Sequence, residues 1–153
     1  MDRIQVKEGK DLNLTDLVKT IQLINQPNLE GIVVTHVTTD SREVVPGTLF
    51  VAIKGYTVDG HEYAVAVVSE RPLDLLVPNL IVRDSSRSIG LLASAFYAYP
   101  SEQMRLFGIT GTNGKTTTTT ILRDVLDVLG HSTGLIGTVE VRINDKIVPS
   151  KNT

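Results

Sequence analysis

A short run of glycine, lysine and threonine residues has the composition of a phosphate-binding loop. Gly111-Thr112-Asn113-Gly114 is followed directly by Lys115, Thr116 and Thr117. At the start of a helix, backbone N–H groups and the helix dipole attract phosphate oxygens. Lys115 can then reach the β- and γ-phosphates of a nucleotide, and the Thr116 hydroxyl can ligate Mg²⁺. The pattern G-x-x-x-x-G-K-[ST] is not met, because Ile109 stands where its first glycine belongs. A chance glycine turn before a helix is the alternative.

The flanking residues supply the elements that such a loop needs. The segment 104–110 predicts a buried-type strand before it, and apolar spacing predicts a helix over 115–129 that ends at Gly130. Residues 132–139 predict a second strand, so this region reads as a β-α-β unit with a parallel sheet. A hairpin over 139–148, turned at Asn144-Asp145, follows.

The first hundred residues predict a different arrangement. Helical spacing extends over 13–24, with Asn13 as its cap, and a second helix begins after a cap at Ser86 and ends at Tyr99-Pro100. Strands are expected at 31–37, 48–53, 65–68 and 75–82. We expect a two-domain α/β protein, with residues 1–100 and 101–153 as its domains and the boundary near Pro100-Ser101-Glu102.

Composition excludes several classes of protein. The 153 residues include 15 Lys and Arg against 17 Asp and Glu, and this net charge of -2 gives no basic field for nucleic acid. No cysteine is present, which excludes disulfides and thiolate zinc sites. Apolar runs fall short of the roughly 20 residues that a membrane helix needs. The N-terminus has no secretory signal, so a cytoplasmic location is expected. The three histidines have no neighbouring metal-ligand pattern.

Two groups of motifs resemble the Mur ligases. Gly111 to Thr116 resembles their ATP loop, which the related folylpolyglutamate synthetases share. In the N-terminal part, Thr39-Asp40-Ser41-Arg42, the run 46–55 and Asp59-Gly60-His61 resemble the UDP-substrate domain of the ligases that add the third and the last peptide residue. Folylpolyglutamate synthetases lack that domain. The resemblance covers essentially the whole chain.

The third-residue ligases are the better match within the family. Gly134-Leu135-Ile136-Gly137-Thr138 followed by Asn152-Thr153 resembles their substrate segment, and Phe96-Tyr97 with Pro100-Ser101 is also similar to theirs. The resemblance implies ATP- and Mg²⁺-dependent addition of L-lysine or meso-diaminopimelate to UDP-N-acetylmuramoyl-L-alanyl-D-glutamate through an acyl phosphate. Three alternatives stay open: a ligase for the last residue, a P-loop kinase or NTPase switch, and a non-catalytic UDP-substrate-binding module.

The resemblance also implies roles for individual residues. Thr39, Ser41 and the loop Tyr56-Thr57-Val58 match uridine contacts, whereas Asn152 and Thr153 match contacts to the sugar-peptide part of the substrate. Gly111 to Thr117 match the ATP loop, with Thr116 on the metal ion. Asp40-Ser41-Arg42 has a plainer interpretation, an Asx turn with a solvated arginine. His61 receives no catalytic role.

Two further expectations concern completeness. The chain ends directly after a predicted strand pair, so we expect it to be truncated, inert by itself and monomeric when full length, with its catalytic residues downstream of Thr153. The family normally has a helix between the Asp-Gly-His turn and the next strand, but here Tyr63 runs directly into Ala64. This loss puts the packing of the N-terminal domain in doubt.

Overall fold

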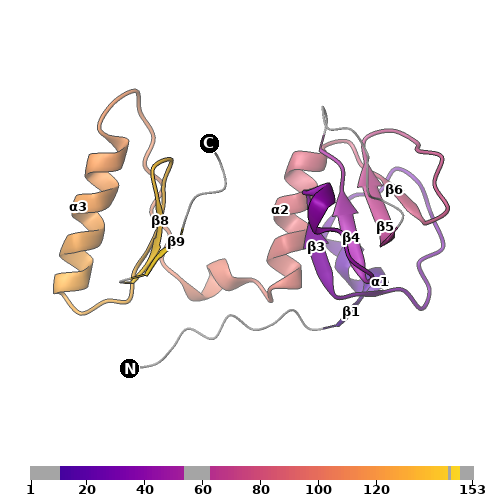
Figure 1. Ribbon diagram of the computed structural model, residues 1–153, viewed down its shortest axis with the longest axis horizontal. Coiled ribbons are helices and arrows are strands. Elements are labelled where there is room, and N and C mark those ends of the chain that lie inside the picture. The colour runs from indigo at the N-terminus through magenta and orange to yellow at the C-terminus, as the bar shows by residue number, and fades with distance from the viewer. Residues whose placement is uncertain (1–10, 54–62, 145, 149–153) are drawn as a thin grey trace. The chain divides into compact units, whose positions relative to one another are not determined.

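The computed structural model describes residues 11–53, 63–144 and 146–148, and it divides into two compact units (Figure 1). The first unit is Met1–Arg105 and the second is Leu106–Thr153. The expected α/β class is confirmed: both units combine helices with a sheet, and the parallel sheet lies in the first. Among the helices of the described ranges, none combines the length and the apolar content needed to cross a membrane.

The described residues of the first unit form two helices and two sheets. Its regular elements, in chain order, are β1 (Leu12–Asn13), α1 (Leu14–Leu17), β2 (Val33–Val34), β3 (His36–Thr38), β4 (Thr48–Val51), β5 (Ala64–Ser69), β6 (Asn79–Ile81) and α2 (Ser85–Phe96). Short 3-10 turns are η1 (Val18–Thr20), η2 (Ser41–Glu43) and η4 (Pro100–Gln103). β1 pairs with β2, and the larger sheet has the order β3-β4-β5-β6 with every pair parallel.

The short connection after β4 does not prevent this sheet from forming. Leu49 pairs with Ala66 and Val51 with Val68, although the register shifts between Thr48 and Leu49. The absence of the helix that the family normally has before this strand therefore does not disturb the pairing of β4 with β5. Residues 54–62 of the connection lie outside the described part of the chain.

Apolar side chains bury both faces of the parallel sheet. On one face Leu49 and Val51 pack in a cluster with Leu92 of α2 and Leu14 of α1, each 0% exposed. On the other face Phe50, at 2% exposure, packs with Val67 and with half-buried residues of the loop before β6. All four residues of β4 are buried, as expected for a central parallel strand.

The predicted helix over 13–24 is much shorter in the structure. α1 covers one turn and η1 ends at Thr20, whose hydroxyl donates to the Leu17 carbonyl at 2.8 Å. Asn13 makes no side-chain cap, because its backbone belongs to β1. Ile24 donates its N–H to the Ile81 carbonyl at 2.8 Å, so a contact with β6 replaces further helical bonds.

Two other predictions in this unit were wrong. Asp84, not Ser86, caps α2: its Oδ1 accepts the Arg87 N–H at 2.8 Å. The strand expected over 75–82 begins only at Asn79, because the Asn79 side chain accepts the Leu73 N–H and donates to the Val67 carbonyl, which shapes the preceding residues as a loop.

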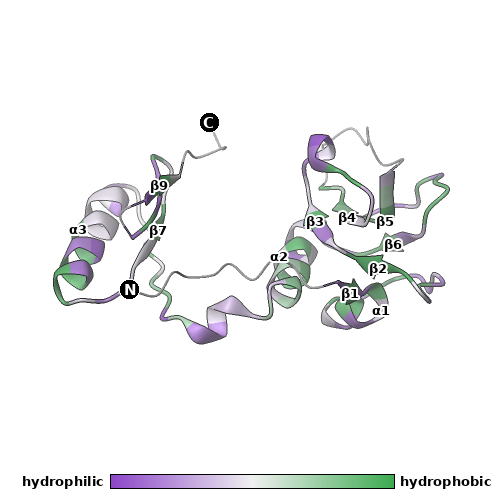
Figure 2. Ribbon diagram, turned by 60° about the horizontal axis from the view of Figure 1, so that its bottom comes forward, coloured by the Kyte–Doolittle hydropathy of each residue, from purple (hydrophilic) through white to green (hydrophobic). Residues whose placement is uncertain are grey.

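In the second unit, the described residues form one helix and one antiparallel sheet. α3 (Lys115–Val128) is followed by β7 (Gly134–Ile136), β8 (Val141–Ile143) and β9 (Lys146–Val148), which pair in the order β7-β8-β9. The predicted hairpin is confirmed, and Asn144 at its turn has φ 50°. Gly130, with φ 83°, ends α3 by donating to Asp127. Figure 2 shows pale threonine turns at the start of α3 and hydrophobic positions toward its end.

The predicted buried strand over 104–110 does not form. These residues have no regular structure, and Leu106 and Phe107 are 70% and 62% exposed. A strand forms only beside a partner that completes its hydrogen bonds, and no described strand of this unit pairs with the segment. The expected parallel β-α-β pairing is therefore absent from the described residues, where β7 pairs only with the antiparallel β8.

Candidate functional site

The glycine loop leads directly into a helix, as its sequence predicts. Gly114 has φ 79°, a left-handed conformation that glycine adopts without steric cost, and α3 begins at the next residue. The Gly114 carbonyl accepts the first helical bond, from the Thr118 N–H at 2.9 Å. Within the part of the chain that the structure describes, no side chain caps this end of α3. Its first-turn amides are therefore available to an anion.

Lys115 folds back over the loop that precedes it. Its Nζ donates to the Gly111 carbonyl at 2.5 Å and to the Thr112 carbonyl at 3.3 Å. The Thr119 hydroxyl donates to the carbonyls of Lys115 and Thr116 at 3.0 and 2.9 Å, which fixes the first turn. The ammonium group therefore lies at the carbonyls of the loop, so the loop and the start of α3 together present a positive charge and backbone donors.

The surroundings of Thr116 suit a magnesium ion that is held mainly by a nucleotide. Thr116 is exposed, and within the described ranges its hydroxyl has no hydrogen-bond partner. The described residues contain no group of three or more acidic or histidine side chains that could hold a metal. Mg²⁺ commonly keeps several waters and binds through one or two protein oxygens together with substrate phosphates. A single threonine hydroxyl fits that mode.

Thr39 and Ser41 lie in a tight turn at the carboxyl end of β3. Asp40, between them, accepts the Arg42 N–H at 3.0 Å and so caps η2. Its carboxylate also accepts the Arg42 Nε and Nη2 at 2.9 and 2.7 Å. This hydrogen bond, with the attraction of the two charges, raises the pKa of Arg42 above its ordinary value. The Asx turn proposed from sequence is therefore present, and the hydrogen bonds between Asp40 and Arg42 stabilise it.

In the same turn, two hydroxyl groups make no hydrogen bond to any described residue. Thr39 and Ser41 are half-buried, and neither hydroxyl has a hydrogen-bond partner in the part of the chain that the structure describes. Sequence reasoning missed Thr38, whose hydroxyl donates to Glu43 and accepts the Asp40 N–H, both at 3.1 Å. The Thr-x-Asp spacing, typical of a side-chain-to-backbone turn, was the available signal. The turn thus orients Thr39 and Ser41 without using their side chains.

The expected site residues fall into three groups. Gly111 to Thr117 form one continuous loop and helix start in the second unit, and Thr39 with Ser41 form one turn in the first. Five residues lie outside the described part of the chain: Tyr56, Thr57, Val58, Asn152 and Thr153.

Comparison with known families gives two matches in this chain. The family model "Mur ligase family, catalytic domain" matches residues 33–86, which contain the parallel sheet and the Thr39–Ser41 turn. The model "Mur ligase middle domain" matches residues 109–153, which contain the glycine loop and α3. Both groups of motifs that carried the resemblance therefore lie inside matched segments.

Curated relatives agree with these matches. The chain is 49% identical over 128 residues to the UDP-N-acetylmuramoyl-L-alanyl-D-glutamate--2,6-diaminopimelate ligase of Bacillus velezensis, covering 78% of this chain and 26% of that ligase. With the ligase of the same name from Halalkalibacterium halodurans it shares 45% identity over 152 residues, covering 94% of this chain and 31% of the relative. The chain thus spans about a third or less of the length of these relatives.

A solved structure supports the fold. The structure of a UDP-N-acetylmuramoyl-L-alanyl-D-glutamate--2,6-diaminopimelate ligase superposes with a TM-score of 0.69 and covers 94% of this chain and 31% of its own. Its sequence identity of 20% makes this a likeness of fold. With two family matches and relatives at 45% and 49% identity, the chain belongs to the Mur ligase family.

Proposed function

We propose that this chain supplies the UDP-substrate site and the ATP loop of a Mur ligase that adds the third peptide residue. The reaction would join diaminopimelate to UDP-N-acetylmuramoyl-L-alanyl-D-glutamate through an acyl phosphate, in the cytoplasm. The observation that carries the proposal is the identity of 49% and 45% to two ligases named for this reaction. L-lysine stays the alternative amino acid.

Residues 1–100 would bind the uridine substrate in this proposal. The half-buried hydroxyls of Thr39 and Ser41, which have no partner in the described ranges, would hydrogen-bond the uracil or ribose. They lie beyond the carboxyl end of a parallel strand, where open α/β sheets commonly bind ligands. The loop Tyr56-Thr57-Val58 would add uridine contacts, and Asn152 with Thr153 would contact the sugar-peptide part.

Residues 101–153 would bind MgATP. The amides at the start of α3 and the Lys115 ammonium would face the phosphates, and Thr116 would ligate Mg²⁺. A bound Mg²⁺ would offset charge on the triphosphate and on the transferring phosphoryl group, which Lys115 alone cannot do. Positioning and electrostatics dominate phosphoryl transfer, so we expect this chain alone to bind its ligands without measurable turnover.

Calorimetric titration of the 153-residue chain tests both sites. We expect MgATP and the UDP-N-acetylmuramoyl dipeptide to bind separately. Lys115→Ala should abolish MgATP binding and leave the uridine substrate unaffected. Ser41→Ala should weaken binding of the uridine substrate and leave MgATP binding unaffected. The loss should be partial, because losing one hydrogen bond costs about 0.5 to 1.5 kcal/mol.

The same titrations, together with an assay of ADP release, separate the alternatives. Preference for the UDP-N-acetylmuramoyl tripeptide over the dipeptide would indicate a last-residue ligase. ADP release that does not depend on the uridine substrate would indicate an NTPase. Uridine-substrate binding with no MgATP binding would indicate a non-catalytic binding module, and absence of both would refute the proposal.

A further inference from the structure

α3 packs on its sheet through a face that includes an arginine. Arg123 has a side chain that is only 11% exposed, and Thr119, Leu122 and Leu126 beside it are half-buried. The apolar residues on the rest of the helix are exposed: Ile121, Val125 and Val128. No described residue of α3 is fully buried. The helix therefore depends on few apolar contacts for its position.

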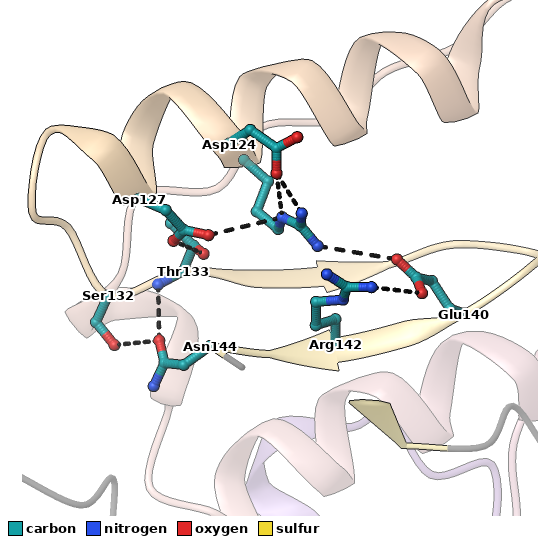
Figure 3. Close-up of polar contacts among 8 residues, drawn as sticks. Asp124, Asp127, Ser132, Thr133, Glu140, Arg142 and Asn144 are labelled. Carbon is teal, nitrogen blue, oxygen red and sulfur yellow. Dashed lines mark hydrogen bonds and ion pairs between the residues drawn. The ribbon is translucent and has the colours of Figure 1, made fainter. Parts of the chain in front are cut away.

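Carboxylates surround the Arg123 guanidinium on two elements. On α3, its Nε donates to Asp124 Oδ1 at 3.0 Å, its Nη2 contacts the same oxygen, and Nε lies 3.7 Å from Asp127 Oδ2. Its Nη1 lies 3.9 Å from Oε1 of Glu140, the residue just before β8 (Figure 3). The other carboxylate oxygen of Glu140 accepts a hydrogen bond from Arg142 Nη2 at 3.2 Å. Arg123 therefore links the middle of α3 to the β7–β8 turn.

A second polar link joins the end of α3 to the hairpin. The Thr133 hydroxyl donates to Asp127 Oδ1 at 2.5 Å. Asn144 Oδ1 accepts the Ser132 hydroxyl at 2.8 Å and the Thr133 N–H at 3.1 Å (Figure 3). Asp127 thus lies near Arg123 and also accepts the Thr133 hydroxyl. The Arg123–Glu140 and Asp127–Thr133 contacts connect α3 to the sheet at two points along the helix.

Arg123 differs from a surface ion pair in two respects. It is largely buried, and its Nη1 has no hydrogen-bond partner among the described residues. Its hydrogen bond to Asp124, opposed by desolvation, raises the pKa of Arg123 above its ordinary value, so it stays charged. A buried charge tolerates little displacement from its partners, whereas apolar contacts are non-directional. Asp124 and Asp127 lie on α3 itself, so Arg123 restricts rotation and sliding of α3 through Glu140, its one partner on the sheet side among the described residues.

We propose that Arg123 is a positioning residue for the phosphate loop, acting through Glu140 on the orientation of α3. Arg123 lies eight residues after Lys115, about 12 Å along the helix at 1.5 Å per residue. A small rotation of the helix at Arg123 therefore moves the first-turn amides and the Lys115 ammonium away from the phosphates. The inference rests on the proposed ATP site and adds a residue that touches neither ATP nor metal.

Four variants of the 153-residue chain test the inference by MgATP titration and thermal unfolding. Arg123→Gln and Glu140→Gln should each weaken MgATP binding about tenfold, since misplacement by 1 Å can have large effects on aligned groups. Arg123→Lys should recover part of the affinity because it keeps the charge. The double variant Arg123→Gln/Glu140→Gln should be no weaker than either single one, as expected for residues that act together. Binding of the UDP-N-acetylmuramoyl dipeptide should not change.

Arg87→Gln is the matched control, because Arg87 is an exposed arginine of the first unit. A lower unfolding temperature of Arg123→Gln with MgATP affinity within twofold of wild type would overturn the proposal and leave Arg123 a structural residue. Should Arg123→Gln not fold, unchanged MgATP affinity in Glu140→Gln and Arg123→Lys would overturn it equally. If Lys115→Ala abolishes MgATP binding but these variants do not weaken it, only this inference fails. If wild type binds no MgATP, the proposed ATP site fails with it.

Discussion

The two units of this chain position their candidate ligand groups by different means. In the first unit, β4 is buried between two apolar clusters, and the turn that carries Thr39 and Ser41 follows the neighbouring strand β3. In the second unit, α3 has no fully buried residue, and Leu135 is the only buried hydrophobic side chain among those described. The candidate phosphate loop therefore precedes a helix with few buried apolar contacts, and we propose that polar links such as Arg123–Glu140 position it.

This difference has a consequence for how each site responds to mutation. Removing one methyl group from a close-packed core leaves a cavity that its neighbours fill only in part. Removing one from an exposed helix face leaves a gap that water fills. We therefore expect truncation of a core apolar side chain in the first unit to lower the free energy of unfolding more than truncation of an apolar side chain on α3. Loss of a polar link between helix and sheet should affect mainly the second unit.

The largest expected effect is on the core of the first unit. Leu92→Ala should lower the free energy of unfolding by about 2 to 5 kcal/mol, because Leu92 is 0% exposed in the cluster between α2 and the sheet. Leu129→Ala is the matched control: this leucine, next to the end of α3, is 66% exposed and should cost less than about 0.5 kcal/mol. Urea unfolding followed by circular dichroism measures both. Equal losses would contradict the contrast between the units.

A smaller effect is expected at the start of α2. Asp84→Ala should cost about 1 kcal/mol, because it removes the side-chain acceptor for the Arg87 N–H. Ser86→Ala, two residues further on, changes an exposed side chain and should have little effect. The same urea titrations would compare them. A greater loss for Ser86→Ala would restore the cap first expected from sequence.

The smallest effect concerns the residues that end the two long helices. Both ends have the same hydrogen-bond pattern, with Ala98 (φ 59°) after α2 and Gly130 (φ 83°) after α3. A left-handed alanine costs roughly 1 to 2 kcal/mol, partly offset by the entropy that glycine loses on folding. Ala98→Gly should therefore raise stability by up to about 1 kcal/mol, and Gly130→Ala should lower it by a similar amount. Thermal unfolding checks both signs, and a loss in Ala98→Gly would show that Ala98 makes compensating contacts.

Local features of the chain could be predicted from sequence because few residues determine them. The helix after Gly114, its end at Gly130 and the turn at Asn144 each follow from the conformations that glycine and asparagine tolerate. The buried strands β4 and β5 follow from runs of β-branched and apolar residues. The motifs carrying the family resemblance were also local, and the family matches cover them.

Only the tertiary structure decided where other elements end and how they pair. The helix after Asn13 stops at Thr20 because Ile24 bonds to β6, far away in sequence, and the apolar segment 104–110 forms no strand because no described neighbour pairs with it. The burial of Arg123 against Glu140 depends on how α3 packs on the hairpin, to which helical periodicity alone gives no clue. Sequence thus determined the conformations that depend on neighbouring residues, and packing determined those whose hydrogen bonds and charges need a distant partner.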